Sequence, residues 1–217
     1  MNKLNENIFH QYNKWKTGYE RKENSLQMRL NDFLSNRSDR IADMYHISED
    51  GKHIDCDATV IIIDADLIDG KLPFPFGKVD GGFGCIKCKN LKSLEGAPKE
   101  VAMSFMCFKC PNLTSLEGTP EKVGDNFDCS ECPNLTSLEG APKEVYGFFD
   151  CRNCKNLKSL EGAPEKVIEW FACSMCDSLT SLKHLPKKIG GMLEVDMRFE
   201  GKIPSDILVK KRDIAYV

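Results

Sequence analysis

Residues 129–150 read CSECPNLTSLEGAPKEVYGFFD, and residues 151–172 read CRNCKNLKSLEGAPEKVIEWFA. The two stretches share two Cys, two Leu, one Pro, one Val and the penultimate Phe, and no insertion separates them. A period of this length is typical of a solenoid, in which each unit buries its apolar side chains against the next unit.

The same unit occurs five times without a break. Its Cys-x-x-Cys pairs follow one another with a constant 22-residue period and are Cys85/Cys88, Cys107/Cys110, Cys129/Cys132, Cys151/Cys154 and Cys173/Cys176. A Phe stands two residues before each first Cys, so both side chains are expected on one face of a strand. The Leu-x-x-Leu step and the Glu-Gly-Ala-Pro turn then bring the chain back. The period predicts a leucine-rich-repeat-type β-solenoid with a parallel sheet on one side and mostly irregular turns on the other.

The chain divides into four predicted parts. These are a helical segment over 1–47, a degenerate cap repeat over 48–78, five full repeats over 79–188, and a degenerate repeat with a cap over 189–217. At the same spacing, Ile63 and Val195 are predicted to occupy the first-Cys position in the terminal repeats. Ser205-Asp206 resembles the start of a short capping helix.

Two amphipathic helices are predicted before the repeats, with a break near Gly18. The apolar positions of the first are Leu4, Ile8, Tyr12 and Trp15, and those of the second are Leu26, Leu30, Phe33, Leu34, Ile41 and Met44. Their apolar faces are expected to cover the N-terminal end of the solenoid, with a separate partner or a dimer mate as the alternative.

Over about residues 55–200, the units resemble leucine-rich repeat proteins of the short-repeat type that bacteriophages and their bacterial hosts encode. They are more distantly similar to short-repeat effectors of enteric pathogens. The resemblance supports the solenoid fold and says little about activity. In this family Asn commonly stands at the ladder position where this chain carries Cys, which puts an Asn side-chain ladder in doubt. The ubiquitin-ligase domain of some effectors has no counterpart here.

Charge and hydropathy exclude several classes of protein. The formal net charge of −3 argues against a general nucleic-acid binder. The longest apolar run, over 60–63, is too short to span a bilayer, and residues 1–7 do not resemble a secretory signal. We therefore expect a cytoplasmic protein, in the bacterial host if phage-encoded, with reduced thiols and no membrane association.

The cysteine ladder admits three interpretations, which are a metal site, disulfide or redox chemistry, and structural thiols in the core. Cys107, Cys110, Cys129 and Cys132 have a spacing that fits a zinc site, and neighbouring rungs would bring their thiols close together. The solenoid period explains the same spacing without a metal, and a free Cys behaves as a small buried hydrophobe. The structural interpretation is favoured, and no cofactor is expected.

The outward side of the strands is the predicted binding surface, because repeat proteins usually bind there. Large apolar side chains on a solvent-facing sheet favour an interaction site. The predicted partner-binding residues are Met106, Phe108, Asp128, Phe148, Asp150, Arg152, Trp170, Glu194 and Asp196. In this prediction the aromatic residues and Met106 are anchors and the acidic residues form a rim.

These observations predict a non-enzymatic module that binds a protein partner on the face of the sheet. If the phage resemblance extends to function, the partner is a host defence protein and the chain is its inhibitor. The alternatives are a metal- or redox-responsive protein that uses the Cys-x-x-Cys ladder and, less favoured, a structural component of a virion or its assembly. The oligomeric state stays open.

Overall fold

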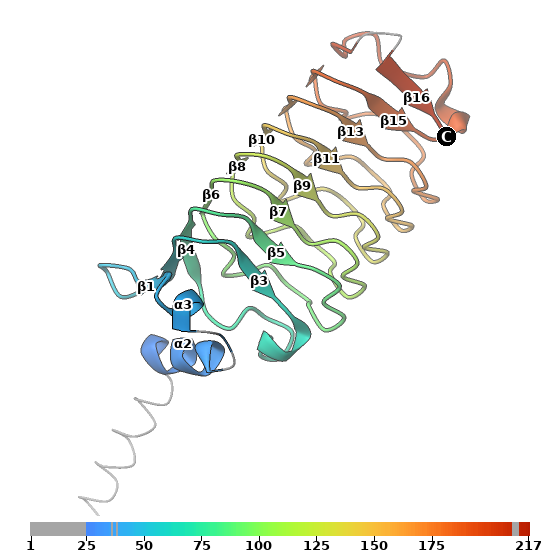
Figure 1. Cartoon of the computed structure of the whole chain (residues 1–217). Helices are drawn as coiled ribbons and strands as arrows, with labels where there is room; N and C mark the ends of the chain where they lie inside the picture. Colours follow the sequence, from blue (N-terminus) through green and yellow to red (C-terminus); the bar gives the residue numbers. More distant parts are fainter. Residues whose placement is uncertain (1–24, 36, 38, 210–212) are drawn as a thin grey trace, which may run out of the picture.

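The computed structural model describes residues 25–35, 37, 39–209 and 213–217. The chain winds as a parallel β-solenoid whose turns stack along one axis, with helices α2 and α3 at its N-terminal end (Figure 1). This arrangement confirms the predicted β-solenoid and its 22-residue spacing.

In the described part of the chain, the strands form two eight-stranded sheets, and each full repeat contributes one strand to each sheet. The valine sheet contains, in spatial order, β1 (Tyr45–Ile47), β2 (Ile54–Cys56), β4 (Phe76–Val79), β6 (Glu100–Val101), β8 (Lys122–Val123), β10 (Glu144–Val145), β12 (Lys166–Val167) and β14 (Lys188–Ile189). The phenylalanine sheet contains β3 (Val60–Ile62), β5 (Phe83–Cys85), β7 (Phe105–Met106), β9 (Phe127–Asp128), β11 (Phe149–Asp150), β13 (Phe171–Ala172), β15 (Leu193–Val195) and β16 (Ile214–Tyr216).

The valine sheet was not predicted from the sequence. Its strands in the full repeats are mostly two residues long, which is too short for an alternating pattern to show. The valines of adjacent turns pair in register, as Val145 does with Val123 and Val167, and their side chains are buried. The repeated Val therefore marks a second strand, and the core lies between two sheets.

A continuous stack of phenylalanine rings forms one wall of the core. The rings of Phe83, Phe105, Phe127, Phe149 and Phe171 are almost completely buried. Neighbouring ring centroids lie 5.1 to 5.5 Å apart, with interplanar angles of 27° or less. Because strand spacing is about 4.8 Å, stacking in register places each ring on the one before it, which adds aromatic attraction to apolar burial.

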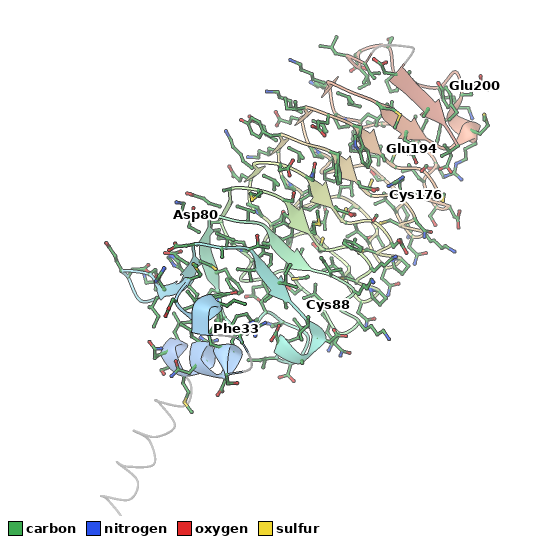
Figure 2. All side chains as sticks on the ribbon, viewed as in Figure 1. Phe33, Asp80, Cys88, Cys176, Glu194 and Glu200 are labelled. Atoms are coloured by element: carbon green, nitrogen blue, oxygen red, sulfur yellow. The ribbon has the colours of Figure 1, made fainter. Side chains whose placement is uncertain are left out.

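The second cysteine of each pair makes a polar ladder along the solenoid. The thiols of Cys110, Cys132, Cys154 and Cys176 each donate to the backbone carbonyl of the first cysteine in the preceding pair, at 2.9 to 3.3 Å. Cys88 donates to the carbonyl of Ile62 in the same way. Figure 2 labels Cys88 and Cys176 at the two ends of this ladder. These thiols satisfy buried carbonyls that would otherwise lack a partner.

Helix α2 (Leu26–Leu34) covers the N-terminal end of the solenoid, as predicted for this helix. Ser25 caps it by accepting from the backbone N–H of Met28. Its Phe33 ring packs edge-on against Phe74 and Tyr45, which closes the end of the aromatic stack. The first predicted helix, with Leu4, Ile8, Tyr12 and Trp15, lies outside the described residues.

The second predicted helix is shorter than expected. It ends at Leu34, and only the single-turn helix α3 (Asp39–Ala42) follows. Ile41 and Met44 are exposed, so they do not belong to the apolar face that was predicted for them. Residues 45–47 form β1, which pairs antiparallel with β2 and ends the predicted helical segment before position 47.

The predicted register of the first cap repeat was wrong by one residue. Ile62, not Ile63, pairs with Cys85, and Val60 pairs with Phe83. This step is therefore one residue longer than the steps between full repeats, and Ile61 and Ile63 are exposed. Three consecutive isoleucines carry no alternation that could have fixed the register.

At the C-terminal end, Val195 is buried at the first-Cys position, as predicted. The predicted helix start at Ser205-Asp206 was wrong, because residues 205–208 form a turn and a single bridge from Leu208 to Lys188. Strand β16 instead pairs with β15 and caps the phenylalanine sheet. A 3-10 turn, η2 (Met197–Phe199), places Arg198 so that its guanidinium donates to the carbonyls of Cys176 and Leu179.

In the part of the chain that the structure describes, no helix is long and apolar enough to cross a membrane.

Because the phenylalanine rings stack in the core, truncating one ring at the centre of the stack should strongly lower the free energy of unfolding. Phe127→Ala should lower the free energy of unfolding by about 3–5 kcal/mol, because the cavity is enclosed by rings on both sides. Urea unfolding followed by circular dichroism measures the change. Phe148→Ala, on the outward side of the next turn, is the control and should cost far less. Equal costs would contradict a core role for the stack.

Candidate functional site

The outward side chains of the phenylalanine sheet form three parallel columns, which we call the sheet face. Pairing in register places Gly84, Met106, Asp128, Asp150, Ala172 and Glu194 in the central column. One flanking column contains Ser104, Asn126, Phe148, Trp170 and Met192, and the other contains Ile86, Phe108, Ser130, Arg152, Ser174 and Asp196. Unlike the inward columns, these columns change residue type at almost every turn.

Phe148 and Trp170 stack on each other in adjacent turns. Their ring centroids lie 4.4 Å apart with an interplanar angle of 17°. Both are half-buried, whereas the sequence predicted exposed side chains. Mutual stacking covers one face of each ring, so a partner would meet an aromatic platform that the two turns already form together.

Arg152 joins two carboxylates across two turns of the solenoid. Its guanidinium donates to both oxygens of Asp150, with Nη2 at 2.6 Å from Oδ2, and Nη1 lies 3.5 Å from Oε2 of Glu194. The intervening central position is Ala172, whose small side chain leaves room for the guanidinium to pass. Ser174 donates to the other oxygen of Glu194, and Figure 2 labels Glu194 on β15.

This network corrects the predicted acidic rim. Asp150 is only 3% exposed and lies beneath Arg152, so it cannot serve as an exposed rim residue. Asp196 is half-buried and pairs with Arg198 at 3.0 Å. Arg152 also lies 5.3 Å from the centre of the Trp170 ring, which connects the charged network to the aromatic platform.

Asp128 differs from the other carboxylates of the network. It is half-buried, and one oxygen accepts from the backbone N–H of Ser130 at 2.9 Å. Among the described residues, no Lys or Arg nitrogen lies within 4.0 Å of its carboxylate. Burial raises the pKa of Asp128 above its usual value, and the nearby charge of Asp150 adds to this shift.

A shallow apolar groove occupies the N-terminal part of the sheet face. Gly82 and Gly84 form its floor, and Ile61, Ile86, Met103 and Met106 are among the residues that line it, around a volume of about 190 Å³. The groove exists because two consecutive outward positions carry no side chain. The groove was not predicted from the sequence, because the predicted register placed Ile63, and with it this strand, one residue out of phase. Two outward glycines beside apolar neighbours were the signal.

The structure thus divides the predicted binding residues into two groups. Met106 lines the groove, and Phe108 is half-buried in the flanking column of the same turn. Phe148, Asp150, Arg152, Trp170 and Glu194 form one connected network, with Asp128 between it and the groove.

In the described part of the chain, the cysteines are not arranged as the zinc site that their spacing would allow. No group of three or more His, Cys, Asp or Glu side chains there is arranged to hold a metal ion, and all eleven cysteines are free. Both thiols of every pair are fully buried. Burial raises the pKa of each first cysteine well above its usual value and raises the pKa of Cys176 to about 12. Such thiols are poor nucleophiles at neutral pH.

No family model, no curated protein and no solved structure matches this chain.

The buried thiols predict that the native protein resists thiol reagents. Ellman's reagent should react with few or none of the cysteines within minutes, and with all eleven after unfolding in guanidinium chloride. A zinc-sensitive dye present during unfolding separates burial from metal ligation, because ligated thiols would release zinc. Rapid reaction of several thiols in the folded protein would contradict the structural role of the ladder.

The Arg152 network predicts a measurable contribution from Asp150 to stability. Asp150→Asn should lower the free energy of unfolding by about 2 kcal/mol, because it leaves a half-buried guanidinium without its bidentate partner. Urea unfolding measures this change, and Asp177→Asn, at an exposed turn position, is the matched control. No difference between the two variants would show that the network contributes little.

Proposed function

We propose that this protein is a non-enzymatic binding module that holds a protein partner on the sheet face. The observation that carries the proposal is the Phe148–Trp170 platform, whose rings are stacked, partly accessible and close to the guanidinium of Arg152. Trp and Arg side chains in preformed surroundings contribute disproportionately to protein interfaces. A platform that needs no rearrangement also loses little entropy when a partner binds.

The charged groups around Arg152 support binding rather than catalysis. Arg152 is neutralised by Asp150 and Glu194, and Ser174 is occupied by Glu194. Side chains paired in this way present a fixed pattern of charge that a partner can recognise. They are not free to transfer protons or attack a substrate.

The opposite sheet has a surface of different character. Lys122 faces Glu144 at 3.8 Å, and Lys143 faces Glu121 at 3.5 Å; Lys122, Lys143 and Glu121 are largely exposed, and Glu144 is half-buried. Opposite charges that alternate from turn to turn are a solvated, self-compensating pattern. The contrast favours the phenylalanine sheet as the side that binds.

The double variant Phe148→Ala/Trp170→Ala tests the proposal. In affinity capture from a lysate of the native host, quantified by mass spectrometry, we expect recovery of the specific partner to fall at least about tenfold. Tyr146→Ala, an exposed aromatic on the valine-sheet side, is the control and should retain the partner.

Circular dichroism and thermal unfolding show whether the double variant is folded, which we expect because both rings lie outside the core. A folded double variant that captures the same proteins in the same amounts would refute binding at this platform.

A further inference from the structure

We propose that the sheet face recognises a partner segment in which an apolar side chain and a Lys or Arg are separated by two strand spacings. The apolar side chain enters the glycine-floored groove, and the cation pairs with Asp128. This inference rests on the proposed function and specifies the chemistry of the partner.

The groove has the size and lining for one apolar side chain. Its volume of about 190 Å³ exceeds that of an apolar cavity known to hold benzene, about 150 Å³. A methyl group at Gly84 would lie 3.1 Å from the end of Ile61 and 3.4 Å from that of Ile86, so even Ala would narrow the floor. Ile61 and Met103 are about half exposed at the rim, where an inserted side chain would shield both from water.

Asp128 lies two turns beyond the groove floor in the same column. Gly84 pairs with Met106, and Met106 pairs with Asp128. At about 4.8 Å per turn, the carboxylate is roughly 10 Å from the floor, which corresponds to about three residues of an extended chain running along the stack. Met106 lies between them and continues the apolar lining up to the carboxylate.

The charge around Asp128 favours a cation over an anion. Asp128 is half-buried without an ion-pair partner among the described residues, whereas neighbouring Asp150 is held by Arg152. Asp125 and Glu131, in the turn that contains Asp128, add further negative charge; among the described residues Glu131 is ion-paired with Lys109, and Asp125 accepts hydrogen bonds from Ser104 and Asn126. Arg152 also acts on Asp128, but its charge is compensated by Asp150 and Glu194. A cationic side chain would compensate the partly desolvated carboxylate of Asp128, while an acidic side chain there would be repelled.

The test begins with a random-peptide library displayed on phage and selected on the full-length protein. We expect enriched sequences to carry Leu, Ile, Met or Phe about three residues from Lys or Arg. Synthetic versions of these peptides should bind with an affinity that falls as salt concentration rises. Enrichment of peptides that lack a basic residue would overturn the proposal. Enrichment of peptides whose basic residue is accompanied by acidic residues and by no apolar residue would overturn it too.

Variants then locate the two contacts. Asp128→Asn should weaken peptide binding about tenfold, and replacing the peptide's Lys or Arg with Gln should weaken it equally, with no further loss when both changes are combined. Asp128→Lys should restore binding to a peptide in which the basic residue is Glu. Gly84→Ala should weaken binding of peptides with large anchors more than that of an Ala-anchored version. Asp177→Asn is the control and should leave binding unchanged. If the losses from Asp128→Asn and from the Gln-substituted peptide add up when the two changes are combined, the proposed pairing of Asp128 with the peptide's cation is overturned.

The outcomes also separate this inference from the proposed function. If non-basic peptides are selected and Phe148→Ala/Trp170→Ala abolishes their binding, the face still binds proteins but its partner has a different chemistry. If no selected peptide responds to any substitution on the face, both proposals fail. A synthetic peptide of residues 1–24, which contains Lys14-Trp15-Lys16, is assayed alongside. Binding of that peptide with the same dependence on Asp128 and Gly84 would assign the groove to the chain's own N-terminal segment and overturn the partner assignment.

Discussion

Successive turns stack in parallel at about 4.8 Å, and this spacing constrains the core, the thiol ladder and the sheet face alike. A residue in one turn lies directly against its equivalent in the next turn, so the choice of side chain at one position limits the choice at the positions above and below. Inside the solenoid, equivalent positions of neighbouring turns meet this constraint by carrying the same residue type. Phe127 lies between Phe105 and Phe149, and Cys132 donates to the carbonyl of Cys107.

The same constraint gives the cysteines their role. A buried thiol is small enough to fit between closely spaced turns, and it can still donate to a carbonyl that the strands leave unpaired. One period after Cys176, the longer Arg198 replaces cysteine and donates to different carbonyls, those of Cys176 and Leu179. The most chemically suggestive feature of the sequence is therefore part of the internal hydrogen bonding. The surface chemistry lies on the outward side, where neighbouring turns need not be identical.

Because outward columns are free to vary, their differences create the candidate site. Two glycines leave a groove, an alanine lets Arg152 reach from Asp150 to Glu194, and Phe148 meets Trp170 to form a platform. The repeat pattern located the columns and most of their members. It did not show that Asp150 is buried beneath a guanidinium, because that depends on Ala172 and Glu194 in later turns. It also placed Ile63 at an inward position, although Ile63 is exposed, because three successive isoleucines show no alternation that could fix the register.

The solenoid, its period and the identity of the inward columns follow from the amino-acid sequence, because a side chain that stacks on its own copy must recur at the same spacing. The second sheet, the longer step before the first full repeat, the strand that caps the C-terminal end and the contacts across the sheet face became visible in the folded chain alone. These features depend on residues that meet in space but do not repeat, such as Arg152 and Glu194, which lie 42 positions apart. A period records what each turn shares with its neighbours, whereas a binding surface depends on how the turns differ.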